Sequence, residues 1–286
     1  MTAPAAQANP AVPAAEGAAV LRVSPRPPGR GRAFARLLAA ERIKLFSTRS
    51  PWWCAGVVVV LLVGLTGLAA ALYSPEQGSA WPAIGGIGAV PMAVVAVLAA
   101  LAVTGEYRTG TVRTTFLAAP DRVRALLAKT VVVAAASAVL GLVASFAAWM
   151  LARVLAPHAD LGLAGAAQWR AVAGVGAVYA VVAVFSIAVG ILVRHGAGAV
   201  TALLVWMLVG EVVLGSLPGV GTGVAVWLPF RNLARFLVAG VADPDPNRAF
   251  FGERLLFGPW AALAYAAGVA VAVLVMALAV ARRRDA

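Results

Sequence analysis

Residues 130–152 read TVVVAAASAVLGLVASFAAWMLA and contain no charged side chain. At a rise of about 1.5 Å per residue, a helix of this length crosses a hydrocarbon core of about 30 Å. Backbone polar groups in lipid must be satisfied within the segment itself, and a continuous helix does this. The stretch therefore predicts a transmembrane helix.

Other apolar runs of similar length lie on both sides of this one. The full set of predicted spans is 54–73, 82–103, 130–152, 171–193, 197–217 and 259–281. The fifth is the least uniform, because it begins just after Arg194 and His195 and contains Glu211. Composition supports the prediction of several spans, since 62% of the 286 residues are hydrophobic and only 12% are charged. So few charged residues could not cover the surface of a soluble protein of this length. The sequence predicts an all-α membrane protein with six transmembrane helices.

The basic residues predict the orientation of these helices. With a cytosolic N-terminus, 17 of the 23 lysines and arginines fall in cytosolic segments and 6 on the opposite side. Lys and Arg accumulate in cytosolic loops, so both termini are expected in the cytosol. The same distribution accounts for the net charge of +12 without nucleic acid as a partner, because no soluble domain collects the basic residues. Only Lys44 and Lys129 are lysines, a bias typical of GC-rich coding.

Two segments precede the first span. Residues 1–31, rich in alanine and proline, are expected to form a disordered cytosolic tail ahead of a six-helix transmembrane domain over 32–286. Residues 33–47, AFARLLAAERIKLFS, place most of their large apolar side chains on one side of a helix, although Glu41 falls in the apolar stripe. They predict an amphipathic helix that lies on the cytosolic membrane surface.

Residues 218–258 are long for a connection between spans five and six. Apolar side chains between Phe230 and Val238 can share one helical face, and Pro229 suits the first turn of a helix. The run Asp243-Pro244-Asp245-Pro246 cannot continue a helix. We expect a short extracytoplasmic re-entrant helix over 229–241. The side chains expected to gate the outer mouth of a pathway are Phe230, Arg231, Arg235 and Phe236.

Glu211 is the only acidic residue inside a predicted span. Intramembrane carboxylates face the interior of a helix bundle or a cavity. One interpretation is a proton or cation site. The other, which we favour, is a hydrogen bond to a neighbouring helix or an ion pair with Arg231 or Arg235.

Motifs of catalysis are lacking in the sequence. There is no HExxH, no GxSxG and no other metal-binding spacing, and neither lysine follows a glycine, which excludes a P-loop. We expect no metal site and no catalytic residue, so the chain is not predicted to be an enzyme.

The charged segment 105–129, GEYRTGTVRTTFLAAPDRVRALLAK, joins spans two and three on the cytosolic side. Glu106 to Phe116 can form a short coupling helix there, although an ordinary basic loop would carry similar charge.

This segment resembles the first cytosolic loop of the permease subunits of type-2 ABC exporters, especially the bacterial drug- and antibiotic-export kind. The matching residues are Gly105, Glu106, Tyr107, Arg108, Gly110, Arg113 and Thr114. The segment from Glu41 through Lys44 and Leu45 to Trp53 is similar to the family's approach to span one. Trp227 to Phe230 is similar to its extracytoplasmic re-entrant region.

The resemblance implies a subunit of the bacterial plasma membrane that moves a substrate outward. A separate cytosolic ABC ATPase would bind ATP, and this chain would bind no cofactor. The implied partners are that ATPase, membrane lipid, and a second copy of the chain or a sister permease. The implied ATPase-coupling interface comprises Glu106, Tyr107, Arg108, Arg113, Glu41 and Lys44.

Other interpretations stay open at this point. Glu106 or Arg108 could instead form a salt bridge within its loop or to the 33–47 helix, for example through an Arg113–Glu41 pair. The whole chain could be an ion-coupled secondary carrier that uses Glu211, or a non-transporting membrane scaffold.

The distribution of basic residues yields a topology that can be measured. In a Cys54→Ala background, which removes the single cysteine, a cysteine at position 110 should react only with membrane-permeant reagents. A cysteine at position 245 should react with impermeant reagents added outside. Labelling of both positions from the same side would contradict the six-span topology.

Overall fold

The computed structural model describes residues 30–74, 81, 89–109, 122–218, 221–241 and 258–284. These residues form helices and turns, with no strand among them. Six helical segments within them are long and apolar enough to cross a membrane. They are α2 (Arg49–Ala71), α4 (Ala89–Thr109), α6 (Arg122–Leu155), α7 (Ala166–Val193), the segment Gly196–Ser216, and α13 (Pro259–Arg284). The prediction of an all-α protein with six helices long and apolar enough to span a membrane is confirmed. Of the predicted disordered tail over 1–31, residues 1–29 lie outside the described residues, and Arg30 and Gly31 belong instead to the first helix.

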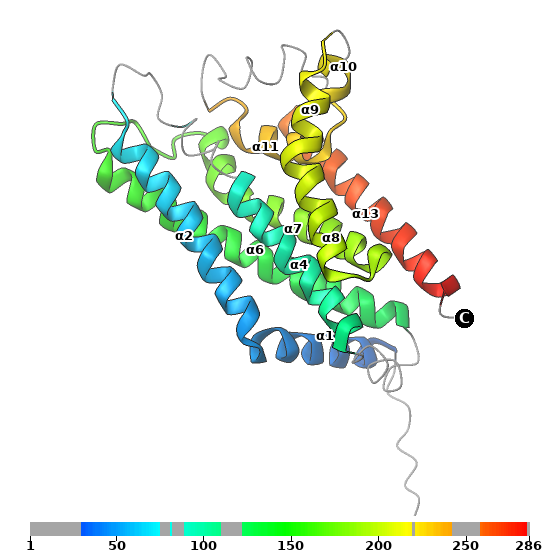
Figure 1. Cartoon of the computed structure of the whole chain (residues 1–286). Helices are drawn as coiled ribbons and strands as arrows, with labels where there is room; N and C mark the ends of the chain where they lie inside the picture. Colours follow the sequence, from blue (N-terminus) through cyan, green and yellow to red (C-terminus); the bar gives the residue numbers. More distant parts are fainter. Residues whose placement is uncertain are drawn as a thin grey trace, which may run out of the picture.

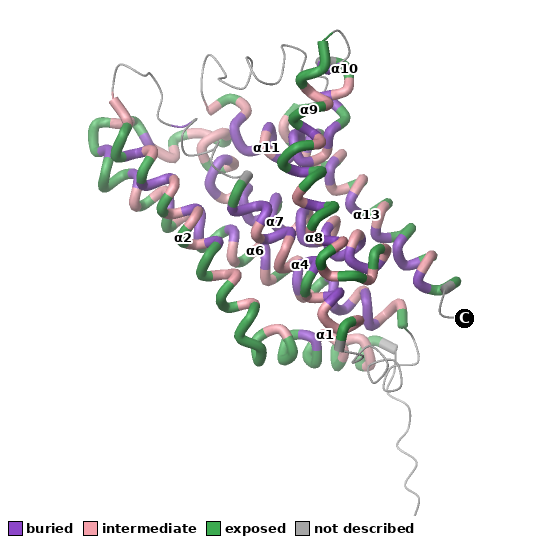
Figure 2. Tube along the Cα trace, in the orientation of Figure 1, coloured by how far each residue is buried: buried purple, intermediate pink, exposed green. Residues whose placement is uncertain are grey.

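Helix α7 lies in the centre of the bundle, where it contacts α4, α6, α13 and the Gly196–Ser216 segment (Figure 1). Its closest approach is to α6, through Gly141 and Gly176. A Cβ atom added to Gly176 would lie 2.8 Å from the carbonyl oxygen of Ala138, and one added to Gly141 would lie 3.0 Å from that of Val175. Glycine at both positions lets the two backbones approach closely, which is how membrane helices gain packing contacts. Buried residues concentrate along α7, as Figure 2 shows.

The fifth candidate span is built from three consecutive segments. They are α8 (Gly196–Leu204), the π-helix η2 (Val205–Gly210) and α9 (Glu211–Ser216). A π-helical turn widens the backbone spiral and rotates the residues that follow it. Glu211 is the first residue after that turn, so the turn helps to set the direction of its side chain.

At one end of the bundle, α1 (Arg30–Ser47) lies across the spans instead of continuing α2 (Figure 1). Thr48 has an extended backbone (φ −96°, ψ 148°), which ends α1 and turns the chain into α2. The predicted helix over 33–47 is therefore present, and its position on the membrane surface stays a prediction. Glu106 to Thr109 continue α4 and do not begin a separate helix. The rest of the predicted coupling helix lies outside the described residues.

At the other end, the short helices α10 (Gly221–Ala225) and α11 (Pro229–Val238) connect α9 to α13. Helix α11 begins at Pro229 as predicted but ends three residues before the predicted limit of 241. The chain leaves it through Gly240, whose φ of +72° is a left-handed conformation that favours glycine. Helix α11 packs against α7 and α13, and eight of its ten residues are buried (Figures 1 and 2). Its placement relative to the membrane stays a prediction.

Candidate functional site

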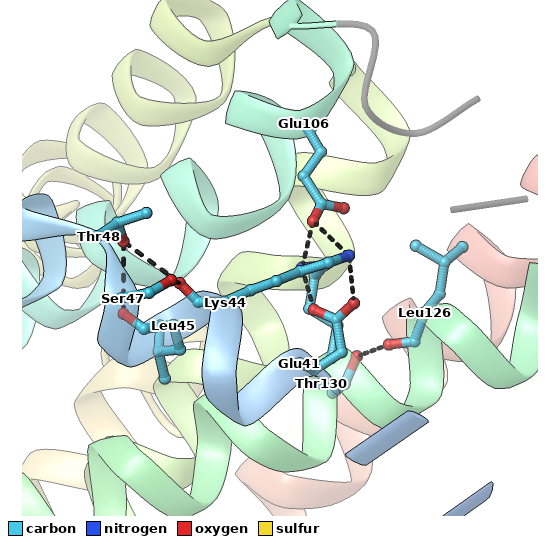
Figure 3. A network of polar contacts seen from close by, with 9 residues as sticks. Glu41, Lys44, Leu45, Ser47, Thr48, Glu106, Leu126 and Thr130 are labelled. Carbon is cyan, nitrogen blue, oxygen red and sulfur yellow. Dashed lines mark hydrogen bonds and ion pairs between the residues drawn. The ribbon is translucent and has the colours of Figure 1, made fainter. Parts of the chain in front are cut away.

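Four charged side chains from three helices meet where α1 crosses the ends of α4 and α6. Glu41 and Lys44 come from α1, and Glu106 comes from the end of α4 (Figure 3). Lys129 comes from α6. Lys129 Nζ lies 2.5 Å from Glu41 Oε2 and 2.9 Å from Glu106 Oε1. Lys44 Nζ lies 2.9 Å from Glu41 Oε1 and 3.4 Å from Glu106 Oε1. We call these four residues the charged network.

Burial makes these pairings necessary. The side chains of Glu41 and Lys129 are only 6% and 8% exposed, whereas those of Glu106 and Lys44 are 20% and 43% exposed. An isolated charge at a buried position would lose its hydration without compensation, so a buried charge must be paired. Each lysine contacts both carboxylates, and the two positive and two negative charges balance. The network is therefore electrically neutral and joins α1, α4 and α6.

The pKa values of the two α1 residues define the pH range of the network. Burial opposes ionisation of Glu41, but the attraction of Lys129 and Lys44 outweighs it and lowers the pKa below 4.5. Burial also opposes the charge on Lys44, but its bonds to Glu41 and Glu106 raise its pKa above 10.5. A lowered acid pKa gives stability that is lost as the pH falls through the folded-state pKa, and a raised base pKa gives stability that is lost as the pH rises through it. These two contributions are therefore complete between about pH 4.5 and 10.5.

The local sequence places Glu41 and Lys44 on one side of α1, because residues three apart are neighbours on a helix surface. Side-chain hydroxyls at the end of the helix donate hydrogen bonds to carbonyl oxygens of its last turn. The hydroxyls of Ser47 and Thr48 donate to the carbonyl oxygen of Lys44, and Thr48 also donates to that of Leu45 (Figure 3). These bonds satisfy carbonyls that a helix end leaves without backbone partners. They fix the end of α1 beside the network.

The structure brings together three of the six residues assigned to the coupling interface, namely Glu41, Lys44 and Glu106. Tyr107 lies next to them, with the Arg194 guanidinium 5.4 Å from the centre of its ring, a favourable cation–π arrangement. Arg108 is exposed at the end of α4. Arg113 lies outside the described residues. The alternative of a salt bridge between Glu106 and the 33–47 helix corresponds to the Glu106–Lys44 contact.

Sequence reasoning missed Lys129. It lies 88 residues from Glu41, and no spacing rule connects positions so far apart. A signal was nevertheless present, because the only two lysines among 23 basic residues both belong to the network. The lysine ammonium is a compact charge with three donors, so it can contact two carboxylates at once. Coding bias therefore does not account for where the two lysines lie.

A second buried acidic group lies at the opposite end of the bundle. Glu211 accepts hydrogen bonds from two backbone amides at the start of α11, from Phe230 N at 2.9 Å and from Arg231 N at 2.7 Å. The first amides of a helix lack intrahelical partners and carry the positive end of the helix dipole, so a carboxylate is favourable there. Both oxygens of Glu211 are engaged, which matches the expected hydrogen bond to a neighbouring segment.

The other end of α11 is held by Arg170 of α7. Arg170 Nε donates to the carbonyl oxygen of Phe236 at 2.6 Å, and its Nη2 donates to that of Ala239. A guanidinium at the C-terminal carbonyls complements the negative end of the helix dipole. Helix α11 thus has a carboxylate at its start and a guanidinium at its end, each supplied by a membrane-spanning segment.

The four residues assigned to the outer gate are all buried in α11. The rings of Phe230 and Phe185 lie 5.2 Å apart, as do those of Phe236 and Trp260. Arg231 and Arg235 were the expected ion-pair partners of Glu211. Both are buried, Glu211 accepts a hydrogen bond from the backbone amide of Arg231, and the Arg231 guanidinium also interacts electrostatically with Glu211. The Arg231 guanidinium lies against Gly215, where a Cβ atom would overlap it.

A comparison of the sequence with models of known protein families found no match, and neither did a comparison with curated proteins. The function must therefore be argued from the geometry of these two sites and from the residue pattern at the end of α4.

The capped ends of α11 lead to a protease test. In right-side-out membrane vesicles, external trypsin should spare Arg235 and cleave at Arg248. Glu211→Ala leaves two buried amides without an acceptor, which costs about 1–3 kcal/mol, so α11 should open more often and Arg235 should be cleaved faster.

The matched control for this test is Val212→Ala, a change at the exposed neighbouring position. It should leave the cleavage rate at Arg235 unchanged. Equal cleavage of Arg235 and Arg248 in the unaltered protein would contradict a buried α11.

Proposed function

We propose that this chain is the membrane-spanning permease subunit of an ATP-driven ABC exporter, energised by a separate cytosolic ATPase. The observation that carries the proposal is the position of Glu106. It belongs to the sequence stretch that resembles the coupling loop of such permeases, and it contacts Lys44 of α1 and Lys129 of α6. A partner that moved the end of α4 would therefore act on two further helices through this one carboxylate.

Because both lysines also bind Glu41, the proposal gives the network two arrangements, one with Glu106 bound to the lysines and one with Glu106 released. Lys129 and Lys44 contact both carboxylates, so either lysine keeps its bond to Glu41 if Glu106 moves away. The α1–α6 contact then persists while α4 shifts relative to both. Conformational switches of this kind turn small displacements at one site into rigid-body movement of packed helices. In the proposed cycle, closure of the ATPase pushes the 105–129 segment and releases α4 from the network.

Arg108 is the residue best placed to meet the ATPase. It follows Glu106 by two residues and is exposed at the end of α4. Its neighbour Tyr107 contacts Arg194 through its ring. We therefore assign Arg108 to direct partner contact and Glu106 to transmission of the movement into the membrane.

The ion-coupled carrier has less support from the geometry. Among the described residues, the candidate spans contain two carboxylates, Glu106 at the end of α4 and Glu211. Glu106 is paired with two lysines, and both oxygens of Glu211 are bound to α11. An ion site would need an oxygen directed toward a pathway. The scaffold interpretation predicts that no ATPase accompanies the protein, which the experiment below addresses.

A second permease completes the proposed transporter. Exposed apolar side chains cover the Gly196–Ser216 segment, including Trp206, Val209 and Val213. Contiguous apolar surface of this kind faces lipid or a partner subunit. We propose a homodimer or a pair with a sister permease, because a permease of the family that the sequence resembles usually forms its pathway from twelve spans, and this chain has six candidate spans.

Charge reversal at Arg108 tests this assignment. The tagged full-length chain would be purified from its native host, and the co-purifying P-loop ATPase would be quantified together with ATP hydrolysis. Arg108→Glu should reduce the recovered ATPase about tenfold, equivalent to about 1.4 kcal/mol, while membrane insertion is unchanged. Glu106→Gln should retain the ATPase but lower transport-coupled hydrolysis, because it acts within the bundle.

The matched control is Arg282→Glu, an exposed arginine near the end of α13. It should retain the ATPase. Recovery of equal ATPase with Arg108→Glu would move the interface elsewhere, and the absence of any ATPase from the unaltered preparation would favour a scaffold.

A further inference from the structure

The corner between α1 and α2 contains an apolar groove that the charged network does not use. Its volume is about 750 Å³, within the range of about 300–1,000 Å³ typical of small-molecule sites. Helices α1, α2, α4 and α6 contribute residues to its walls. Representative lining residues are Leu38 and Leu45 of α1, Trp52 of α2, Leu98 of α4, and Ala135 and Leu140 of α6.

The groove exists because α1 turns away from α2 at Thr48 and is held against α6 by the Glu41–Lys129 pair. The turn itself is braced by Trp52, whose Nε1 donates to the carbonyl oxygen of Phe46 at 3.1 Å. The rings of these two residues lie 5.7 Å apart. Small side chains at Ala135 and Ala136 leave space on the α6 side. The Glu41–Lys129 pair and the contact between Phe46 and Trp52 therefore hold the walls in place.

The composition of the lining indicates an acyl chain as the occupant. Apart from Arg42 and Ser137, every lining residue is apolar or aromatic. Cavities with such walls do not hold water well. Three of the four contributing helices are candidate membrane spans, and the outer surface of such a span is surrounded by hydrocarbon when it crosses a bilayer. Phe46 and Trp52 are largely exposed, and such aromatic residues are typical of the membrane interface, where headgroups lie.

Arg42 supplies a charge at the groove. It follows Leu38 by four residues and precedes Leu45 by three, so it shares their helix face. Among the residues that the structure describes, it is the only charged one that lines the groove, and it is exposed. Within the described ranges, no acidic side chain forms an ion pair with Arg42, whereas nearby Lys44 contacts two carboxylates. A basic group at the membrane surface beside an apolar groove attracts the phosphate of an anionic lipid.

We propose that the α1–α2 groove is a binding site for one anionic phospholipid, with an acyl chain along α6 and the headgroup at Arg42. The site is independent of the proposed transport function. Lipid in the groove fills the space beneath α1 and supports the contact between α1 and α6. Zwitterionic phospholipids fit the same apolar walls but gain less from Arg42.

Lipid retention tests the proposal. The full-length protein would be equilibrated with vesicles containing equal amounts of phosphatidylglycerol and phosphatidylcholine with identical acyl chains. Co-purified lipid would then be measured by native mass spectrometry in mild detergent. The unaltered protein should retain phosphatidylglycerol in preference, and Arg42→Gln should reduce that preference about fivefold, the effect of one basic residue near a membrane surface. Arg36→Gln, which removes an exposed arginine of α1 outside the groove lining, should not.

A second pair of variants tests the apolar walls. Ala135→Trp fills the groove and should reduce retention of both lipids, whereas Ala147→Trp, at an exposed position of α6 outside the groove, should have no effect. Equal retention of the two lipids by the unaltered protein would overturn the proposal. Equal losses with Arg36→Gln and Arg42→Gln, or a dimer mass without lipid, would also overturn it, since they indicate general surface charge or a second copy in the groove.

Discussion

The pairing of Glu41 with Lys129 is the interaction on which the rest of this end of the molecule depends. Both side chains are almost fully buried, and neither charge would be tolerated there alone. Their contact requires α1 to lie across the start of α6, which in turn requires the chain to turn at Thr48 before α2. The apolar groove under α1 and the approach of Glu106 to the same lysine both follow from this arrangement.

At the opposite end of the bundle, buried polar groups are also paired, but here they are the backbone groups at the two ends of α11. Helix α11 is too short to be stable by itself, and its end groups would be costly to bury without partners. Glu211 and Arg170 supply those partners from two spans. Between the two ends, packing is largely apolar and depends on close approaches such as that of α6 and α7 at Gly141 and Gly176. Polar contacts therefore set the geometry of the ends, where the proposed transporter would couple to its ATPase and open its pathway, while apolar packing holds the middle of the bundle together.

The sequence was informative wherever a feature depends on neighbouring residues. Runs of apolar residues predicted the six spans, and Pro229 predicted the start of α11, because span length and first-turn chemistry are local properties. The three-residue spacing of Glu41 and Lys44, which puts them on one helix face, is a local property of the same kind. Lys129 was missed because its partner lies 88 residues away, and that meeting depends on how α1 and α6 pack. The amides that bind Glu211 belong to a separate helix 19 and 20 residues further along the chain, so the acceptor was identified from sequence while its donors were not.

The central claim is that a balanced, buried charge pair holds α1 against α6, and a charge exchange tests it most directly. Lys129→Glu brings three carboxylates together and Glu41→Lys brings three ammonium groups together, so each single variant should lose about 3–5 kcal/mol, measured as a large fall in the Tm of the purified protein. The double exchange restores the balance and should recover most of that loss, giving a strongly non-additive cycle. If the double variant is as unstable as the two single losses added together, the pair does not hold α1 in place and the account is wrong.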